Sequence, residues 1–343
     1  MLYLISLVLP VCIAIGFTYG GVLTFTTTAF YIAFEVVTFL IGFRPLQPTK
    51  KHSWFYTAVL LLNAAAYFAV LIYGATQMSQ RVLWEQIVLT YFVGYHGGST
   101  AAVTAHELIH RADRLQRWCG FAILTAFNWA HYGIHHLVIH HAYSGTAKDP
   151  AAPKLGESCY GFFVRAAQAY VRGAIAFEAD RLRKRQRSPY SVRNRMWWTT
   201  LPFFFVCLVF HQLWSFEGLG LLLGQASIAT FALVVGDYVQ HYGLVRKETQ
   251  AGRYDREDEN YSWSSGYPLV CAQLLNITSH ADHHSHPTRH YQQLRYIEGT
   301  PLLPTSQSIS VAAAMIPPLW RKMMDPRVAA LKQRASTTLD RAG

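Results

Sequence analysis

Histidine is the residue most able to do chemistry in this chain, with 16 copies among 343 residues. Three clusters and one single position stand out: His106 and His110 in HELIH, His136, His140 and His141 in HxxxHH, His280, His283 and His284 in HxxHH, and His241. Positions i, i+3 and i+4 share one face of a helix. HELIH therefore directs two imidazoles toward one point, and each of the other clusters adds a third alongside.

These imidazoles indicate metal binding. Nine neutral imidazoles are too many for one ion with about four to six ligands, so the pattern predicts two metals. Imidazole binds zinc, copper, iron and nickel alike, so ligand type leaves the metal open. Each cluster alone has a plainer interpretation, because HELIH also occurs at capped helix ends or, with Glu107 as general base, in zinc peptidases. Their joint occurrence favours a metal centre.

The composition places this centre in a membrane protein. Hydrophobic residues make up 52% of the chain and charged residues 14%, against about 25% charged residues in a soluble domain. This excludes a disordered chain, a coiled coil and a collagen. The net charge of +11 comes from basic residues between long uncharged tracts, as in basic membrane loops rather than a nucleic-acid surface. The five cysteines form no CxxC pair, so no disulfide framework or thiolate metal site is expected.

Six apolar stretches have about the length that a bilayer core requires. They run over residues 3–19, 21–43, 54–77, 84–104, 196–214 and 218–239. Every Lys and Arg except Arg81 falls in the connections on one side of these spans. Because basic residues mark the cytoplasmic side, we expect both termini and the parts 105–195 and 240–343 to be cytoplasmic. The first stretch lacks a basic start and a clear cleavage site, so we expect it to be retained.

Two further segments belong to the predicted cytoplasmic part. The apolar run 118–130 is too short to span a bilayer and predicts a re-entrant or interfacial piece. Residues 157–187 predict an amphipathic helix on the inner leaflet. Its basic residues offer a surface to lipid headgroups or to an acidic partner; they are Arg181, Arg183, Lys184, Arg185 and Arg187. The predicted fold class is all-α, a single polytopic membrane domain over 1–343 with six transmembrane helices and a cytoplasmic helical cap.

The histidine clusters match four motifs of a known family. The pattern HELxH matches 106–110, and EHNxxHH, followed by Thr and Asp-Pro-Ala, matches 135–141 with Thr146, Asp149, Pro150 and Ala151. NYxEHYG matches 237–243, and HxDHHxxPTRxYQ matches 280–292. In these motifs the chain resembles the integral-membrane alkane monooxygenase family, within the membrane fatty acid desaturase and hydroxylase superfamily. The combination is highly specific for the family.

The resemblance implies a di-iron site in the cytoplasmic cap, with two non-haem irons held by the nine histidines. It implies O2-dependent hydroxylation of the terminal carbon of an n-alkane to a primary alcohol, in the bacterial inner membrane. Electrons would come from NAD(P)H through a reductase and rubredoxin. Both are expected as separate chains, because a fused rubredoxin would need CxxC pairs. An alkane partitions into the bilayer, so a channel between helices can lead it to the metals.

Three departures from the family pattern matter here: His135 stands in place of Glu, Asp237 in place of Asn and Gln240 in place of Glu. A carboxylate near a metal ligand orients its imidazole and raises its basicity. Glu107, Asp282 and Asp237 are the candidates for this role, with a helix cap or a surface position as the alternative for each. Among the implied properties, the identity of the substrate is the one that these departures affect most.

Other polar residues have plainer interpretations. Glu35 lies inside the second span, where an ionisable group is costly; it is either an acid near the site or a partner of a Thr one turn away. His96 and His211 are expected as packed core residues. Four more histidines lie near the matched positions but outside them: His131, His135, His286 and His290.

Three other functions remain open. A sister enzyme, such as a xylene-type methyl hydroxylase or a fatty acyl desaturase, differs only in its product. A zinc membrane metalloprotease built on His106, Glu107 and His110 predicts one zinc and leaves the other clustered histidines unexplained. A metal transporter would need polar residues along its spans, and the first, third and fifth spans carry almost none.

Overall fold

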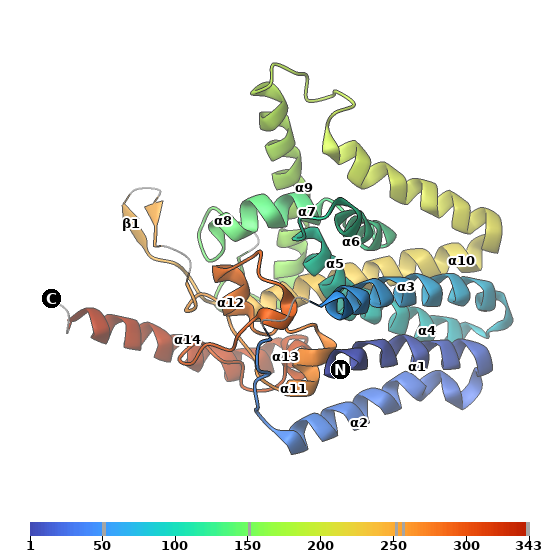
Figure 1. Ribbon diagram of the computed structural model, residues 1–343, viewed down its shortest axis with the longest axis horizontal. Coiled ribbons are helices and arrows are strands. Elements are labelled where there is room, and N and C mark those ends of the chain that lie inside the picture. Colours follow the sequence, from blue (N-terminus) through green and yellow to red (C-terminus); the bar gives the residue numbers. More distant parts are fainter. Residues whose placement is uncertain (50–52, 150–151, 251–252, 256–257, 341–343) are drawn as a thin grey trace.

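The protein is a bundle of helices with one small hairpin of strands (Figure 1). The computed structural model describes residues 1–49, 53–149, 152–250, 253–255 and 258–340. The motif residues Pro150 and Ala151 lie outside this range. The predicted all-α class is confirmed, because the two short strands are the only exception among the described residues.

The first part of the chain forms long apolar helices. A 3-10 turn (Leu2–Leu7) leads into α1 (Val8–Tyr19), a second turn (Gly21–Phe25) into α2 (Thr26–Ile41), and α3 (Trp54–Gln77) ends in the turn Met78–Gln80. Helix α4 (Leu83–His96) continues through a π-helix (Gly97–Ala101) into α5 (Ala102–Ile109). HELIH therefore begins inside a helix, four residues into α5.

Helix α10 (Arg195–His241) is the longest element, with 47 residues. If it were straight it would be about 70 Å long, twice the thickness of a bilayer core. Trp214 and Ser215 depart from helical geometry, and Ser215 has a φ of 53°. The helix reverses direction there (Figure 1). Its two arms correspond to the predicted spans 196–214 and 218–239.

Four helical stretches among the described residues are long and apolar enough to cross a membrane: Leu2–Tyr19, Gly21–Ile41, Trp54–Gln80 and Arg195–His241. They cover every predicted span except 84–104, with the second span ending at Ile41 instead of residue 43. That region is helical, but it is not among the four. The polar residues His96, Ser99, Thr100 and Thr104 make it less apolar than the others.

The remaining elements surround these helices. They are α6 (Arg114–Ala126), α7 (Tyr132–His135), a π-helix (His136–His140), α8 (His141–Tyr143), α9 (Cys159–Arg183), the antiparallel strands β1 (Glu248–Gln250) and β2 (Arg253–Tyr254), α11 (Pro268–Gln273), α12 (His280–Ser285), the turn Tyr291–Gln293, α13 (Gln307–Ala314) and α14 (Pro317–Asp340). The helix predicted over 157–187 is confirmed as α9. The run 118–130 overlaps α6, which packs against α5.

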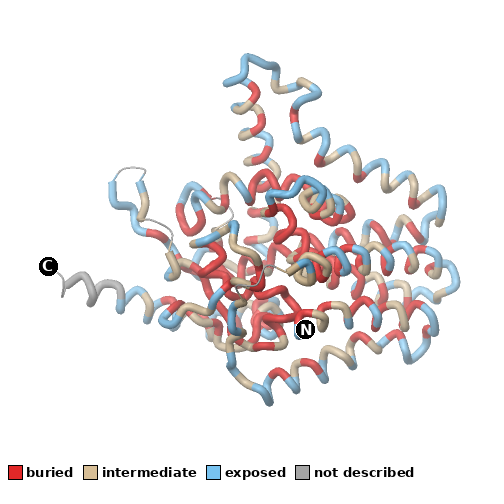
Figure 2. The backbone as a smooth tube through the Cα atoms, in the orientation of Figure 1, coloured by how far each residue is buried: buried red, intermediate tan, exposed pale blue. Residues whose placement is uncertain are grey.

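Close packing between α4 and the second arm of α10 positions the histidines. A Cβ atom added to Gly98 would lie 2.3 Å from the carbonyl oxygen of Ala229, and one added to Gly94 would lie 2.6 Å from Ile228 Cβ. Only glycine allows this approach, as at small-residue contacts between membrane helices. Helix α4 and the π-helix that leads into the His106 helix therefore pack against the arm of α10 that ends at His241. The centre of the molecule is buried (Figure 2).

Candidate metal centre

The structure brings the nine predicted histidines together in two adjacent groups. The five-histidine group consists of His106, His110, His136, His141 and His283, and one ring nitrogen from each lies within 4.8 Å of the others. The four-histidine group consists of His140, His241, His280 and His284. Imidazoles from five helical segments thus converge in the buried centre.

Short distances between ring nitrogens define each group. In the five-histidine group, His136 Nε2 lies 2.8 Å from His106 Nε2 and 3.0 Å from His141 Nε2. In the four-histidine group, His280 Nε2 lies 2.9 Å from His241 Nε2 and 3.0 Å from His284 Nε2. Nitrogens that face one another this closely all point toward one common centre in each group.

Each pair of adjacent histidines divides between the two groups. His140 and His284 join the four-histidine group, while His141 and His283 join the five-histidine group. The spacing i to i+4 correctly pairs His280 with His284, but it wrongly pairs His136 with His140. Residues His136–His140 form a π-helix, whose i to i+5 register brings His136 to His141 instead.

Burial keeps these imidazoles neutral. It is the largest cause that holds the pKa of His283 well below its ordinary value, and repulsion from His106 adds to it. Burial, followed by repulsion from neighbouring histidines, also lowers the pKa values of His136 and His280. A neutral imidazole is the form that binds a metal.

The donor set fits metal ions. His283 is 1% exposed, and neither of its ring nitrogens has a hydrogen-bond partner among the described residues. Leaving such a buried polar atom unpaired costs about 1–3 kcal/mol. A cation at the common centre of the five-histidine group would satisfy it.

The carboxylate of Asp149 contacts a clustered histidine directly. Asp149 Oδ2 lies 2.8 Å from His140 Nδ1, and both side chains are buried. The sequence motif contains Asp149, but we did not predict this role for it. Its only sequence signal is the Asp-Pro-Ala that follows the histidine cluster, because nine residues of separation carry no helical periodicity.

The first carboxylate nominated from the sequence, Glu107, contacts other groups. It forms an ion pair with Arg111 at 2.7 Å and accepts a hydrogen bond from the backbone N–H of Tyr291 at 3.1 Å. Burial is the largest influence on it and raises the pKa of Glu107, against the opposing effect of Arg111. Glu107 thus ties the HELIH helix to the segment after the last histidine cluster.

Asp282 anchors helix α12. It contacts the guanidinium of Arg289, accepts a hydrogen bond from Arg295 Nη2 at 3.1 Å, and accepts another from the backbone N–H of Arg295 at 2.9 Å. Burial alone would raise the pKa of Asp282, but these hydrogen bonds together lower it. Since α12 carries His280, His283 and His284, Asp282 supports both groups through the helix.

Two departures from the family pattern meet at Tyr170. The Tyr170 hydroxyl donates to Asp237 Oδ2 at 2.6 Å, and the Tyr170 ring packs edge-on against His135, with ring centroids 4.4 Å apart. His135 is fully buried and belongs to neither histidine group. Gln240, the third departure, precedes His241 and lines the pocket described below.

The other polar residues lie as follows. His96 is fully buried beside the ring of Tyr67, as predicted, and His211 packs against Phe216. Glu35 does not bind a Thr; its Oε2 accepts a hydrogen bond from Ser306 Oγ at 2.9 Å. The remaining histidines contact groups outside the two clusters: His131 contacts Trp129, His286 lies 3.4 Å from Asp282, and His290 contacts Arg111.

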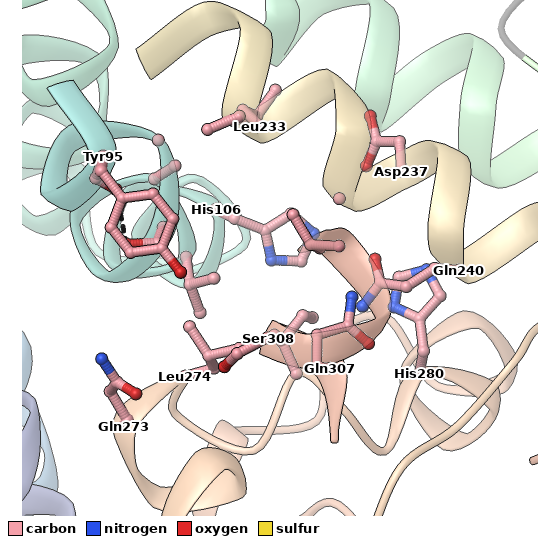
Figure 3. A pocket seen from close by; sticks show the side chains of 18 of the residues that line it. Tyr95, His106, Leu233, Asp237, Gln240, Gln273, Leu274, His280, Gln307 and Ser308 are labelled. Carbon is pink, nitrogen blue, oxygen red and sulfur yellow. Dashed lines mark hydrogen bonds between the residues drawn. The ribbon is translucent and has the colours of Figure 1, made fainter. Parts of the chain in front are cut away.

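A narrow pocket of about 90 Å³ reaches both histidine groups (Figure 3). It touches His106 and His136 of the five-histidine group and His280 of the four-histidine group. Helix α4 and the π-helix after it, the second arm of α10, α11 and α13 form its walls. These walls are mostly apolar, with side chains such as Leu233 and Leu274. Such a pocket suits a slender apolar molecule.

A larger groove of about 1660 Å³ lies between α3, α6 and the first arm of α10. It reaches His110 and His141, both of the five-histidine group. No residue of the four-histidine group lines it. The two cavities therefore approach the centre from different directions.

Comparisons with known proteins agree with this geometry. The fatty acid desaturase family matches residues 82–306. Alkane 1-monooxygenase 2 of Alcanivorax borkumensis is 31% identical over 318 residues, which cover 90% of this chain and 83% of the relative. Alkane 1-monooxygenase 1 of Pseudomonas aeruginosa is 36% identical over 236 residues, which cover 68% of this chain and 61% of the relative.

A more distant relative has a different named substrate. The hydroxylase component of the xylene/toluene monooxygenase of Pseudomonas putida is 27% identical over 353 residues, covering 99% of this chain and 91% of the relative. The family match spans all four motifs, and the first relative covers nearly the whole chain. The chain therefore belongs to the fatty acid desaturase family and, within it, to the alkane 1-monooxygenase group.

Proposed function

We propose that this protein hydroxylates the terminal carbon of an n-alkane to give a primary alcohol. The observation that carries the proposal is the narrow apolar pocket that touches both histidine groups. Two relatives are named alkane 1-monooxygenases, which supports the same substrate class. Burial of the alkane supplies the binding free energy, at about 0.8 kcal/mol per CH2 group.

The nine histidines would hold two irons, one in each group. When bound, the irons would supply the electron transfer to O2 that cleavage of an unactivated C–H bond requires. The chain's own residues position the reaction. The apolar wall excludes water, and His106, His136 and His280 mark the end of the pocket where the reacting carbon would lie.

A separate rubredoxin, reduced by its reductase with NAD(P)H, is the proposed electron donor. The absence of CxxC pairs from the sequence supports this. The basic surface predicted on α9 is partly neutralised, because Arg181 pairs with Glu178 and Lys184 with Asp180, each at 2.7 Å. Replacing rubredoxin with buffer in an assay with reductase and NADH should abolish turnover.

The proposed location is the bacterial inner membrane, with six spans and both termini in the cytoplasm. The distribution of Lys and Arg supports it, because all except Arg81 fall on one side of the predicted spans. Alkaline phosphatase fused after Arg81 should be active, and the same enzyme fused at the C-terminus should be inactive. The opposite pattern would reverse the orientation.

One experiment tests the reaction itself. Purified protein is analysed for metals and incubated with octane, dodecane or xylene together with rubredoxin, reductase and NADH. Two irons per chain and a primary alcohol from the alkanes are expected. An alkene product would indicate a desaturase, and oxidation of xylene alone would indicate a methyl hydroxylase of the xylene type.

The zinc metalloprotease is the alternative from a different class. It requires Glu107 to act as a general base beside the metal, yet Glu107 is held by Arg111 and by the backbone of Tyr291. One zinc per chain and no oxygenated product would nevertheless favour it over the monooxygenase.

A further inference from the structure

The large groove between α3, α6 and the first arm of α10 has a basic lining. Among the described residues that line it there is neither Asp nor Glu, but there are four arginines: Arg111, Arg114, Arg117 and Arg195. The narrow pocket has the opposite character, because Asp237 lines it and none of its described lining residues is Lys or Arg. The groove therefore favours an anionic occupant, whereas an alkane carries no charge.

Two of the four arginines already have an acidic partner. Arg111 is buried and pairs with Glu107 at 2.7 Å. Arg195 pairs at 2.5 Å with Glu178, which is fully buried. The charges of Arg111 and Arg195 are therefore balanced within the protein.

Arg114 and Arg117 supply the unbalanced charge. Arg114 is exposed and Arg117 is half-buried, and neither forms an ion pair with an acid in the described part of the chain. Arg117 Nη1 donates to the backbone carbonyls of Arg111 and Ala112 at 2.9 Å and 2.7 Å, which fixes this guanidinium at the groove. The nearby Asp113 caps the start of α6 and does not line the groove.

The face of α6 that lines the groove changes from charged to apolar along the helix. It begins with Arg114 and Arg117, continues with Trp118, and goes on to Phe121 and Ala122. These positions have the spacing i, i+3, i+4, i+7 and i+8, which places them on one side of a helix. Charge, indole and apolar surface thus follow one another along this wall.

The first arm of α10 repeats this order. Arg195 comes first, Trp198 follows, and the rest of the wall is mostly apolar, with side chains such as Phe205, Val209 and Leu213. Trp198 and Phe205 are 66% and 68% exposed, and the arm lies on the outside of the bundle (Figure 1). Trp prefers the boundary between lipid headgroups and hydrocarbon. Both walls therefore match a phospholipid, in the order phosphate, boundary and acyl chain.

The size of the groove also suits a lipid. Its volume of about 1660 Å³ exceeds the roughly 300–1,000 Å³ of typical small-molecule sites. Basic pockets between membrane helices bind anionic lipid headgroups. An acidic soluble protein would match the arginines, but it would leave the long apolar walls behind them unfilled.

We infer that this groove binds an anionic phospholipid of the bilayer, with its phosphate at Arg114 and Arg117 and its acyl chains along α6 and the first arm of α10. The bound lipid would cover the side from which the groove reaches His110 and His141. The inference is independent of the proposed function, because it requires neither a metal nor a reaction.

Lipid binding to the full chain tests this site. The protein is delipidated in detergent and titrated with phosphatidylglycerol or phosphatidylcholine that carry the same oleoyl chains, and native mass spectrometry counts the bound lipids. One phosphatidylglycerol per chain should bind about tenfold to thirtyfold more tightly than phosphatidylcholine, as expected for two arginines near a membrane surface. Equal affinities for the two lipids would overturn the inference.

Arg114→Gln tests the headgroup contact. It removes one of the two unbalanced charges and should lower the preference for phosphatidylglycerol about fivefold. Arg183→Gln is the matched control, because Arg183 on α9 is also exposed but does not line the groove, and it should keep the preference. An unchanged preference in Arg114→Gln would overturn the inference and leave the arginines to an acidic protein.

Val209→Trp tests the acyl-chain contact by filling the groove. It should weaken the binding of both lipids about tenfold or more, since excluding only two CH2 groups has that effect. Leu208→Trp is the matched control, because Leu208 is 64% exposed and does not line the groove, and it should leave both affinities unchanged. Unchanged lipid binding in Val209→Trp together with loss of dodecane binding would overturn the inference and assign the groove to the alkane.

Discussion

The two histidine groups lie side by side, yet the protein holds them differently. In the four-histidine group, His140 Nδ1 contacts Asp149 at 2.8 Å, and His241 Nδ1 lies 3.5 Å from Ser144 Oγ. In the five-histidine group, four imidazoles come within hydrogen-bonding distance only of one another, as far as the described residues show, and His283 has no hydrogen-bond partner. A partner on the second ring nitrogen fixes the orientation of an imidazole. His140 and His241 of the four-histidine group are thus oriented before metal binds.

The two groups also differ in how deeply their histidines are buried. All members of the four-histidine group are buried, whereas His110 and His141 of the five-histidine group are only partly buried and border the large groove. Tyr132 stacks on His136, with ring centroids 4.7 Å apart, so packing orients this ring. We conclude that a metal in the five-histidine group would exchange faster. The order of the histidines in this group would also depend more on the bound metal.

Removing one ligand from each group gives the largest expected effect. His283→Ala should lower the iron content from two to about one per chain by emptying the five-histidine group, and His241→Ala should do the same for the four-histidine group. Each should reduce activity more than about 100-fold, beyond the loss typical of a residue that only supports a ligand. Iron analysis and alkane turnover measure this.

The control for both variants is His211→Ala, which removes a histidine outside the two groups. It should keep two irons, and all three proteins should remain inserted in the membrane. Full activity in His241→Ala would remove that residue from the ligand set.

The next largest effect is expected from a change that weakens metal binding in both groups and so removes the difference between them. Asp282→Asn weakens the contacts with Arg289 and Arg295 that anchor α12, and this helix supplies histidines to both groups. Both irons should therefore be lost together in a chelator titration, with an affinity decrease of about tenfold or more. Loss of only one iron would show that α12 keeps its place without the charge of Asp282.

Asp149→Asn should instead enlarge the difference. It removes the carboxylate from His140 only, so the four-histidine group should lose about 10–100-fold in iron affinity while the five-histidine group stays unchanged. A chelator titration that separates two iron classes measures this. Glu217→Gln, an exposed acid at the bend of α10, is the control and should change neither class. Equal weakening of both classes would contradict the separate support of the groups.

These predictions also show how far the sequence alone could lead. The nine histidines and the matching of the apolar stretches to helices were predictable, because ligand type and bilayer thickness are local constraints. The assignment of each histidine to a group was not. The pairing of His136 with His141 depends on a π-helix, whose backbone register is set by packing rather than by the spacing of histidines.

Tertiary contacts account for the rest of what the sequence left open. Asp149 follows His140 by nine residues, through the short helix α8 and then a series of turns, so no periodicity links them. The carboxylate of Asp237 was expected near His241, one helical turn away, but the Tyr170 hydroxyl on α9 binds it. A partner more than 60 residues distant cannot be found from local pattern alone.

The smallest expected effect concerns this third carboxylate. Asp237→Asn restores the residue of the family pattern and keeps an oxygen that accepts from the Tyr170 hydroxyl. Because Asp237 binds Tyr170 rather than an imidazole, iron affinity in both groups should change less than about threefold, within the free energy of one altered hydrogen bond. The same chelator titration measures this, with Asp149→Asn as the positive reference. A selective loss of iron from the four-histidine group would instead show that Asp237 supports His241. Asp237, which binds Tyr170, would then act in the same way as Asp149, which contacts His140.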